Sequence, residues 1–194
     1  MRDHIVRAAF HETVLQTAHL DRNTFVVDEL GLKNGVIRAD IAVLNGKLVG
    51  YEIKTDKDNL TRLSSQINAY SEVFDQAYII SGKKHLSKVL DQVPGWWGVY
   101  AIESDEEEIC TFNCLRPAIL NEQRSAYSIA QLLWKAEVAE VLENHFNCVL
   151  KQSWTKHRLY EILIDKLDVH ALGQLTLGIL KNRQGWRTNP KPLL

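Results

Sequence analysis

Two carboxylates and a lysine lie on two neighbouring predicted strands, at a spacing that could bind a metal ion. Asp40 lies in the alternating run VIRADIAVL, and Glu52 and Lys54 lie in the following run KLVGYEIKT. The pair Asn45-Gly46 between the runs predicts a tight hairpin. The two strands should then pair about 4.8 Å apart, with Asp40 and Glu52 on the same face of the sheet. Carboxylates this close could share one divalent cation.

The metal that suits such a site is Mg²⁺ or Mn²⁺, because hard cations take oxygen ligands and keep several waters. Asp40, Glu52 and the backbone carbonyl of Ile53 would supply enough protein ligands. An activated water could attack a phosphodiester in line, and Lys54 would orient it or offset charge on the phosphate oxygens. The blander interpretation is a cross-strand ion pair of Glu52 and Lys54 on a solvated face, with Gln66 an ordinary helix-surface residue.

Other classes of chemistry have no support in the sequence. There is no G-x-x-x-x-G-K-[ST] loop, G-x-G-x-x-G turn or G-x-S-x-G elbow, so we expect no nucleotide cofactor and no esterase-type nucleophile. The formal charge of −1 and the pI of about 6.7 give no global positive field, so nucleic-acid binding must use local patches. The candidates are Lys57, Arg62, Lys181, Arg183 and Arg187. For Lys57 and Arg62, exposed surface charge is an equally good interpretation.

The order of predicted elements indicates an α/β fold with a mixed sheet. Strand 76–81 should be parallel to an earlier strand, because a helix crosses between them. Val49, Tyr51 and Ile53 should share one face, opposite Glu52 and Lys54. In the preceding strand, Ala39 and Ile41 should share a face opposite Asp40. The expected elements are a helix over 3–19 with His4, His11 and His19 mostly outside, a strand over 23–30, a turn over 31–35, hairpin strands over 36–44 and 47–55, a helix from 58 or 59 to 74, strand 76–81, helix 84–91 and strand 99–103.

The C-terminal part is predicted to be helical. Periodic leucines indicate helices over 126–146, 156–168 and 170–183. We therefore divide the chain into an α/β domain over 1–120 and a helical subdomain over 121–194. The last two helices are compatible with a helix-turn-helix-like unit on DNA, and equally with simple packing of their leucines.

Three short motifs carry a resemblance to a known superfamily. RAD at 38–40, EIK at 52–54 and QINAY at 66–70 follow one another on strand, strand and helix. In this order they resemble the PD-(D/E)xK nuclease superfamily, especially its RecB-like branch, over about residues 3–82. The longer pattern that includes PGWWG at 94–98 resembles an uncharacterised bacterial and phage family within that superfamily.

The resemblance implies a restriction-endonuclease-like core of order α-β-β-β-α-β. It also implies that Asp40 and Glu52 are metal ligands and that Lys54 is the catalytic lysine. Gln66 and Tyr70 would support the active site or the DNA. Ala39 stands at the variable position of the name-giving proline, which carries no chemistry.

An additional acidic residue often lies upstream in that superfamily, and Glu29 would match it. Asp28 is adjacent, however, and a change of one residue in strand register would exchange which of the two faces the site. The sequence leaves this choice open.

The expected function is that of a Mg²⁺- or Mn²⁺-dependent deoxyribonuclease with DNA as its partner. One alternative is a catalytically inactive nucleic-acid-binding module on a nuclease-like scaffold. Another is an interaction protein whose Trp96-Trp97 loop binds a protein, although such a pair more often packs a loop onto the core.

The cellular setting follows from cysteines and hydropathy. Cys110, Cys114 and Cys148 are odd in number and lack a second zinc knuckle, so we expect reduced thiols in the cytoplasm. No run approaches the roughly 18 apolar residues needed to span a bilayer, so we expect no membrane association. The sequence leaves the oligomeric state open, a homodimer included.

Overall fold

The sheet has six strands in chain order, and the expected mixed α/β class is confirmed. The computed structural model describes residues 2–104 and 109–183. The ladder is antiparallel from β1 to β3, parallel from β3 to β5, and antiparallel again between β5 and β6. The predicted parallel pairing of strand 76–81 is therefore correct. The strands are β1 (Phe25–Leu32), β2 (Ile37–Asn45), β3 (Lys47–Lys54), β4 (Gln76–Ser81), β5 (Gly98–Ser104) and β6 (Cys110–Arg116).

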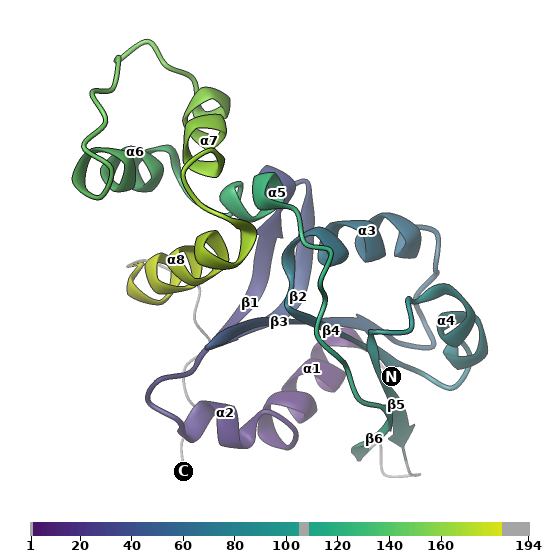
Figure 1. Ribbon diagram of the computed structural model, residues 1–194. Coiled ribbons are helices and arrows are strands. Elements are labelled where there is room, and N and C mark those ends of the chain that lie inside the picture. The colour runs from purple at the N-terminus through teal and green to yellow at the C-terminus, as the bar shows by residue number, and fades with distance from the viewer. Residues whose placement is uncertain (1, 105–108, 184–194) are drawn as a thin grey trace.

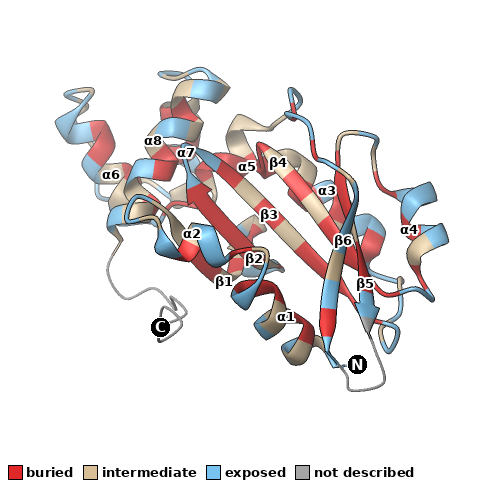
Figure 2. Ribbon diagram, turned by 90° about the horizontal axis from the view of Figure 1, so that it is seen from below, coloured by how far each residue is buried: buried red, intermediate tan, exposed pale blue. Residues whose placement is uncertain are grey.

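Helices cover both faces of this sheet. α1 and α2 lie on one face and α3 on the other, while α4 lies beside β4 and β5 and α5 to α8 gather on the side of β1 and β2 (Figures 1 and 2). In the described ranges, no helix is both long and apolar enough to cross a membrane. The helices are α1 (Asp3–Glu12), α2 (Gln16–Leu20), α3 (Leu63–Val73), α4 (Leu86–Gln92), α5 (Ala126–Ala130), α6 (Lys135–Asn144), α7 (Lys156–Ile164) and α8 (Val169–Asn182), with a 3₁₀ turn, η1, over Lys33–Gly35.

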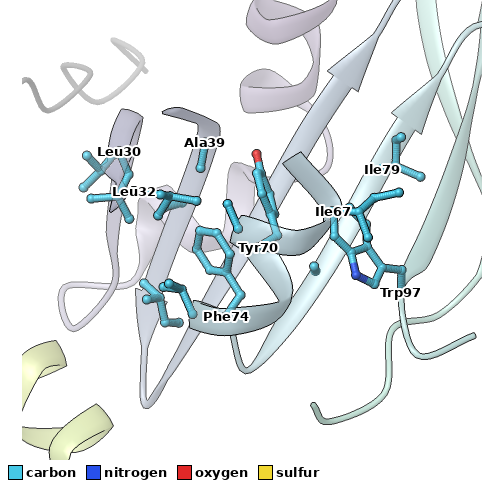
Figure 3. Close-up of a cluster of buried hydrophobic side chains, with 14 of the residues drawn as sticks. Leu30, Leu32, Ala39, Ile67, Tyr70, Phe74, Ile79 and Trp97 are labelled. Carbon is cyan, nitrogen blue, oxygen red and sulfur yellow. The ribbon is translucent and has the colours of Figure 1, made fainter. Parts of the chain in front are cut away.

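The core between the sheet and α3 is built from large, fully buried side chains. Tyr70 packs between Phe74 and Trp97, with ring centroids 4.8 and 5.2 Å away (Figure 3). Gly50 lets α3 approach β3, since a Cβ there would lie 2.6 Å from the ring of Phe74. Trp97 is fully buried, which confirms that its loop packs onto the core.

The C-terminal helices have a core of their own and also join the sheet. Ile129, Leu142 and Tyr160 lie in this separate cluster. Leu177 and Leu180 of α8, however, belong to the cluster between the sheet and α3. The change from strands to helices falls between β6 and α5, as the sequence predicts.

Two predicted helices are broken. The helix expected over 3–19 turns after α1, where the hydroxyl of Thr13 bonds the carbonyl of Ala9 at 2.7 Å. The helix expected over 126–146 is interrupted because Glu137 binds the backbone amide of Trp134 at 2.7 Å and begins α6 there.

Three other boundaries differ for local reasons. Asp58 accepts bonds from the amide and hydroxyl of Thr55, both at 2.7 Å, so it closes a turn and α3 begins later, at Leu63. Asp168 caps α8 through the amide of Ala171 at 2.8 Å, so α7 ends before it. Strand β6 is absent from the elements that the sequence predicts.

Candidate active site

The candidate site lies where β2 and β3 separate. Their ladder runs from the Asn45–Lys47 pair to the Ile41–Tyr51 pair. Beyond it, β2 pairs only with β1, and β3 pairs only with β4, among the described residues. The strands therefore fork just before Asp40 on one side and Glu52 on the other.

The alternation of side chains shifts at this fork. Ala42 of β2 lies in the core under α3, and so does Ala39, although strict alternation would place them on opposite faces. Ile41 lies in the core under α1. The prediction that Ala39 and Ile41 share a face is therefore wrong. Glu29, opposite this point on β1, has a φ of +56°, a left-handed conformation that redirects the strand.

Glu52 is fixed by three donors in a buried setting. Its side chain is 1% exposed, and Lys54 Nζ lies 2.6 Å from its Oε1. Tyr70 donates to its Oε2 at 2.8 Å, and Gln66 Nε2 donates to Oε1. Burial raises the pKa of Glu52, and the hydrogen bonds of these three residues only partly oppose that rise. The ion pair of the blander interpretation is thus present, but Glu52 and Lys54 lie on the same strand, and the pair is buried instead of cross-strand on a solvated face.

Asp40 occupies the opening of the fork. Its Oδ2 accepts from the amide of Ile53 at 2.7 Å, replacing a strand-to-strand bond. Its own amide donates to the hydroxyl of Tyr70 at 3.2 Å. Burial, followed by repulsion from Glu52, raises the pKa of Asp40 from 3.8 to about 8. The two carboxylates are therefore close enough to interact electrostatically, as the hairpin predicts.

Tyr70 links the carboxylate of Glu52 to the backbone amide of Asp40. Its hydroxyl oxygen points away from Phe74 (Figure 3) and lies 3.1 Å from the carbonyl of Tyr51, in addition to its bonds with Asp40 and Glu52. Burial, with Glu52 and Asp40 nearby, raises the pKa of Tyr70 well above its usual value, so the hydroxyl keeps its proton. One side chain thus holds the two strands of the fork at a fixed separation.

Replacing Tyr70 by phenylalanine is expected to lower the free energy of unfolding by about 2 to 3 kcal/mol, because a charged acceptor and a buried amide lose their partner. Urea denaturation measures this change. Tyr160→Phe is the matched control: its hydroxyl makes one bond, to the carbonyl of Leu133 at 2.8 Å, and its loss should cost about 1 kcal/mol. Equal losses in the two variants would contradict the linking role of Tyr70.

Arg7 is a site residue that the sequence reasoning missed. Its guanidinium bonds Asp40 twice, at 2.9 Å to the carbonyl and 3.2 Å to Oδ1, and it pairs with Glu29 at 2.9 Å. Burial lowers the pKa of Arg7, but Asp3, Asp40 and Glu29 outweigh it, so the pKa is raised. The available signal was the i, i+4 spacing of Asp3 and Arg7 beside the apolar stripe of α1.

Asp28 and Glu29, between which the sequence leaves the choice open, have different partners. Glu29 shares the guanidinium of Arg7 with Asp40. Asp28 lies 3.0 Å from His11 Nε2, and His11 Nδ1 lies 2.8 Å from His19 Nε2. His11 and His19 are both buried, so the expectation that they lie mostly outside is wrong. His11 of α1, His19 of α2 and Asp28 of β1 thus form a chain of polar contacts between these three elements.

The donor set around the fork fits a hard divalent cation. Asp40 and Glu52 offer carboxylate oxygens, and Gln66 Oε1 is a buried oxygen without a hydrogen-bond partner among the described residues. No group of three or more His, Cys, Asp and Glu side chains within 2–104 and 109–183 is placed to hold a metal ion. Any cation here would therefore use two carboxylates and amide or water oxygens. It is the amide of Ile53, not its carbonyl, that contacts Asp40.

The predicted nucleic-acid contacts have different surroundings. Lys57 and Arg62 are exposed on the segment between β3 and α3. Arg183 is committed to Glu137, with two bonds of 2.6 Å, and lies 4.2 Å from the ring of Trp134. Lys181 is half-buried in the last turn of α8, and Arg187 lies outside the described residues.

Comparison with known proteins places this chain in a phage family. Protein cII of Enterobacteria phage P4 is 26% identical over 183 residues, which is 94% of this chain and 68% of that protein. The chain matches no solved structure. Residues 2–189 match the family model described as Bacteriophage P4 protein cII. Since this match extends over far more than half of its length, the chain belongs to the bacteriophage P4 protein cII family.

Proposed function

We propose that this protein is a divalent-metal-dependent nuclease that hydrolyses DNA phosphodiester bonds at the fork between β2 and β3. The observation that carries the proposal is the hydrogen-bonded network of buried Glu52, Lys54 and Tyr70 with half-buried Asp40 and Gln66. Placing two carboxylates and a lysine in such surroundings makes the fold less stable than apolar side chains of similar volume would. Such arrangements cluster at functional sites.

The restriction-endonuclease-like core is part of this proposal. The order of the elements supports it. When α1 and α2 are counted as one helical unit and the 3₁₀ turn η1 is left out, the first six elements follow the order α-β-β-β-α-β. Asp40 lies on the second strand, Glu52 and Lys54 on the third, and Gln66 and Tyr70 on the helix that crosses to β4. This is the placement that the resemblance to PD-(D/E)xK nucleases implies.

The chain's own residues would bind and orient the substrate. Asp40 and Glu52 would hold Mg²⁺ or Mn²⁺, with Gln66 Oε1 beside them. When bound, such a cation supplies an activated water and neutralises developing phosphate charge. Lys54 carries a positive charge into a nearly dry site, where it stabilises a phosphate more strongly than it would in water. Tyr70 keeps Glu52 in a fixed orientation throughout.

The DNA backbone would approach along the exposed segment before α3. Lys57 and Arg62 lie there, after the strand that carries Glu52 and Lys54. Phosphate contacts of this kind position the substrate and do not read its sequence. Replacing both by glutamine should weaken DNA binding and reduce its salt dependence by about two counterions. Fluorescence anisotropy at several salt concentrations measures this, and an unchanged salt dependence would count against this path.

The test of the function is cleavage of end-labelled single-stranded, duplex and branched DNA in Mg²⁺, Mn²⁺ or EDTA. We expect products that require metal from at least one substrate. The absence of products in every condition from folded protein would refute the nuclease proposal.

A second candidate is a nucleic-acid-binding module without turnover. It is favoured by one observation: both carboxylates already have a cationic partner, Arg7 at Asp40 and Lys54 at Glu52. DNA binding that is equal in Mn²⁺ and EDTA, and unaffected by replacing Lys54, would support this alternative.

A further inference from the structure

The guanidinium of Arg7 lies where a cation at Asp40 would have to compete for oxygens. Its Nη2 is 3.2 Å from Asp40 Oδ1, while Nη1 is 2.9 Å from both the Asp40 carbonyl and Glu29 Oε1. The Arg7 side chain is only 15% exposed, so these contacts are largely shielded from water. Asp40 Oδ2 is taken by the amide of Ile53. Both oxygens of the Asp40 carboxylate are thus occupied by donors from the protein itself.

We propose that Arg7 holds Asp40 and Glu29 in the metal-free protein, as a built-in counter-ion of Glu29 and of Asp40 when that carboxyl is ionised, and releases Asp40 when a divalent cation binds. This inference rests on the proposed metal site and adds a residue that sets its affinity. The Ile53 amide belongs to the sheet and cannot move away alone, whereas the Arg7 side chain is long and comes from a helix outside the sheet. The contact with Arg7 is therefore the one that gives way.

Asp3 gives the released guanidinium a second partner. It lies four residues before Arg7 on α1, and its Oδ1 is 3.1 Å from Nη2, the same nitrogen that contacts Asp40. The side chain of Asp3 is 43% exposed and can follow Arg7 outward. After the release of Asp40, Arg7 therefore still has an ion pair with Asp3. This pair lowers the free-energy cost that metal binding must overcome.

The test measures Mn²⁺ affinity by isothermal titration calorimetry, with thermal unfolding in EDTA as the second readout. Arg7→Met should bind Mn²⁺ about tenfold more tightly than the wild type, since no charge-assisted bond must be broken. In EDTA the same variant should unfold at a lower temperature, because Asp40 and Glu29 then lose their counter-ion. A residue with a merely structural role would not change the two readouts in opposite directions.

Two further variants separate the effect of the guanidinium's hydrogen bonds from the effect of its charge. Arg7→Lys keeps the charge but cannot bridge Asp40 and Glu29 at once, so it should bind Mn²⁺ more tightly than the wild type by about threefold. Asp3→Asn removes the second partner and should weaken Mn²⁺ binding. If Arg7→Met binds Mn²⁺ equally or more weakly than the wild type, the counter-ion role is wrong.

The failure of this inference differs from the failure of the proposed function. If the wild type binds Mn²⁺ and cleaves DNA but Arg7→Met shows no tighter binding, only the role of Arg7 is refuted. If neither protein binds Mn²⁺ and the wild type cleaves nothing, the metal site itself is refuted, and the counter-ion role with it.

Discussion

Replacing Lys54 by methionine is expected to abolish DNA cleavage and to lower the free energy of unfolding by about 3 to 5 kcal/mol. The loss of stability arises because Glu52, 1% exposed, would lose the cation that lies 2.6 Å from its Oε1. An unpaired carboxylate at that depth must take up a proton or distort the fork. The loss of cleavage follows because no other lysine or arginine side chain in the described residues bonds Glu52.

A double variant separates these two effects. In Lys54→Met with Glu52→Gln, position 52 is neutral and can still bond Tyr70 and Gln66, so most of the lost stability should return while cleavage remains absent. Lys88→Met is the matched control: this lysine is exposed on α4, and its replacement should change stability by less than about 0.5 kcal/mol. Urea denaturation and the cleavage assay are run on all of them. Recovery of cleavage in the double variant would show that neither Lys54 nor Glu52 has a chemical role.

Replacing Asp40 by asparagine is expected to stabilise the metal-free protein at alkaline pH. The pKa of Asp40 is raised from 3.8 to about 8 by burial and by repulsion from Glu52. Between these values the folded protein binds a proton that the unfolded chain does not. The contribution of Asp40 to stability is therefore full below about pH 4 and is lost as the pH rises through about 8.

Asparagine has no such titration, so the stability advantage of Asp40→Asn over the wild type should grow with pH. Between pH 5 and pH 8 we expect it to increase on the order of 1 to 3 kcal/mol. Urea denaturation in EDTA at both values measures it. Asp3→Asn serves as a control for the lost contact with Arg7, since it also removes one of that residue's ion pairs. A constant difference between Asp40→Asn and the wild type would show that Asp40 is ionised in the folded protein at pH 5.

Much of the site could be predicted because it depends on local rules. The Asn45-Gly46 turn fixes the hairpin, and the period-two pattern of β3 correctly separates Ile53 from Glu52 and Lys54. The helix that follows must cross the sheet before β4, which brings Gln66 towards Glu52. Each of these inferences uses residues close together in the sequence.

What could not be predicted depends on contacts between distant segments. Arg7 reaches Asp40 across 33 residues, and nothing in the amphipathic pattern of α1 shows that a polar side chain beside the apolar stripe lies against the sheet. His11 and His19 are buried for the same reason. The shift of alternation at Asp40 lies opposite Glu29, which has a left-handed conformation. A glutamate gives no sequence signal for this conformation, which is typical of glycine.

The most direct test of the central claim is cleavage of DNA at pH 8 in Mn²⁺ by the wild type and by Asp40→Asn side by side. Because Asp40→Asn is expected to be the more stable protein under metal-free conditions at this pH, loss of activity could not be attributed to unfolding. We predict metal-dependent products from the wild type and none from Asp40→Asn. Equal products from both proteins would contradict the assignment of the fork between β2 and β3 as the hydrolytic site.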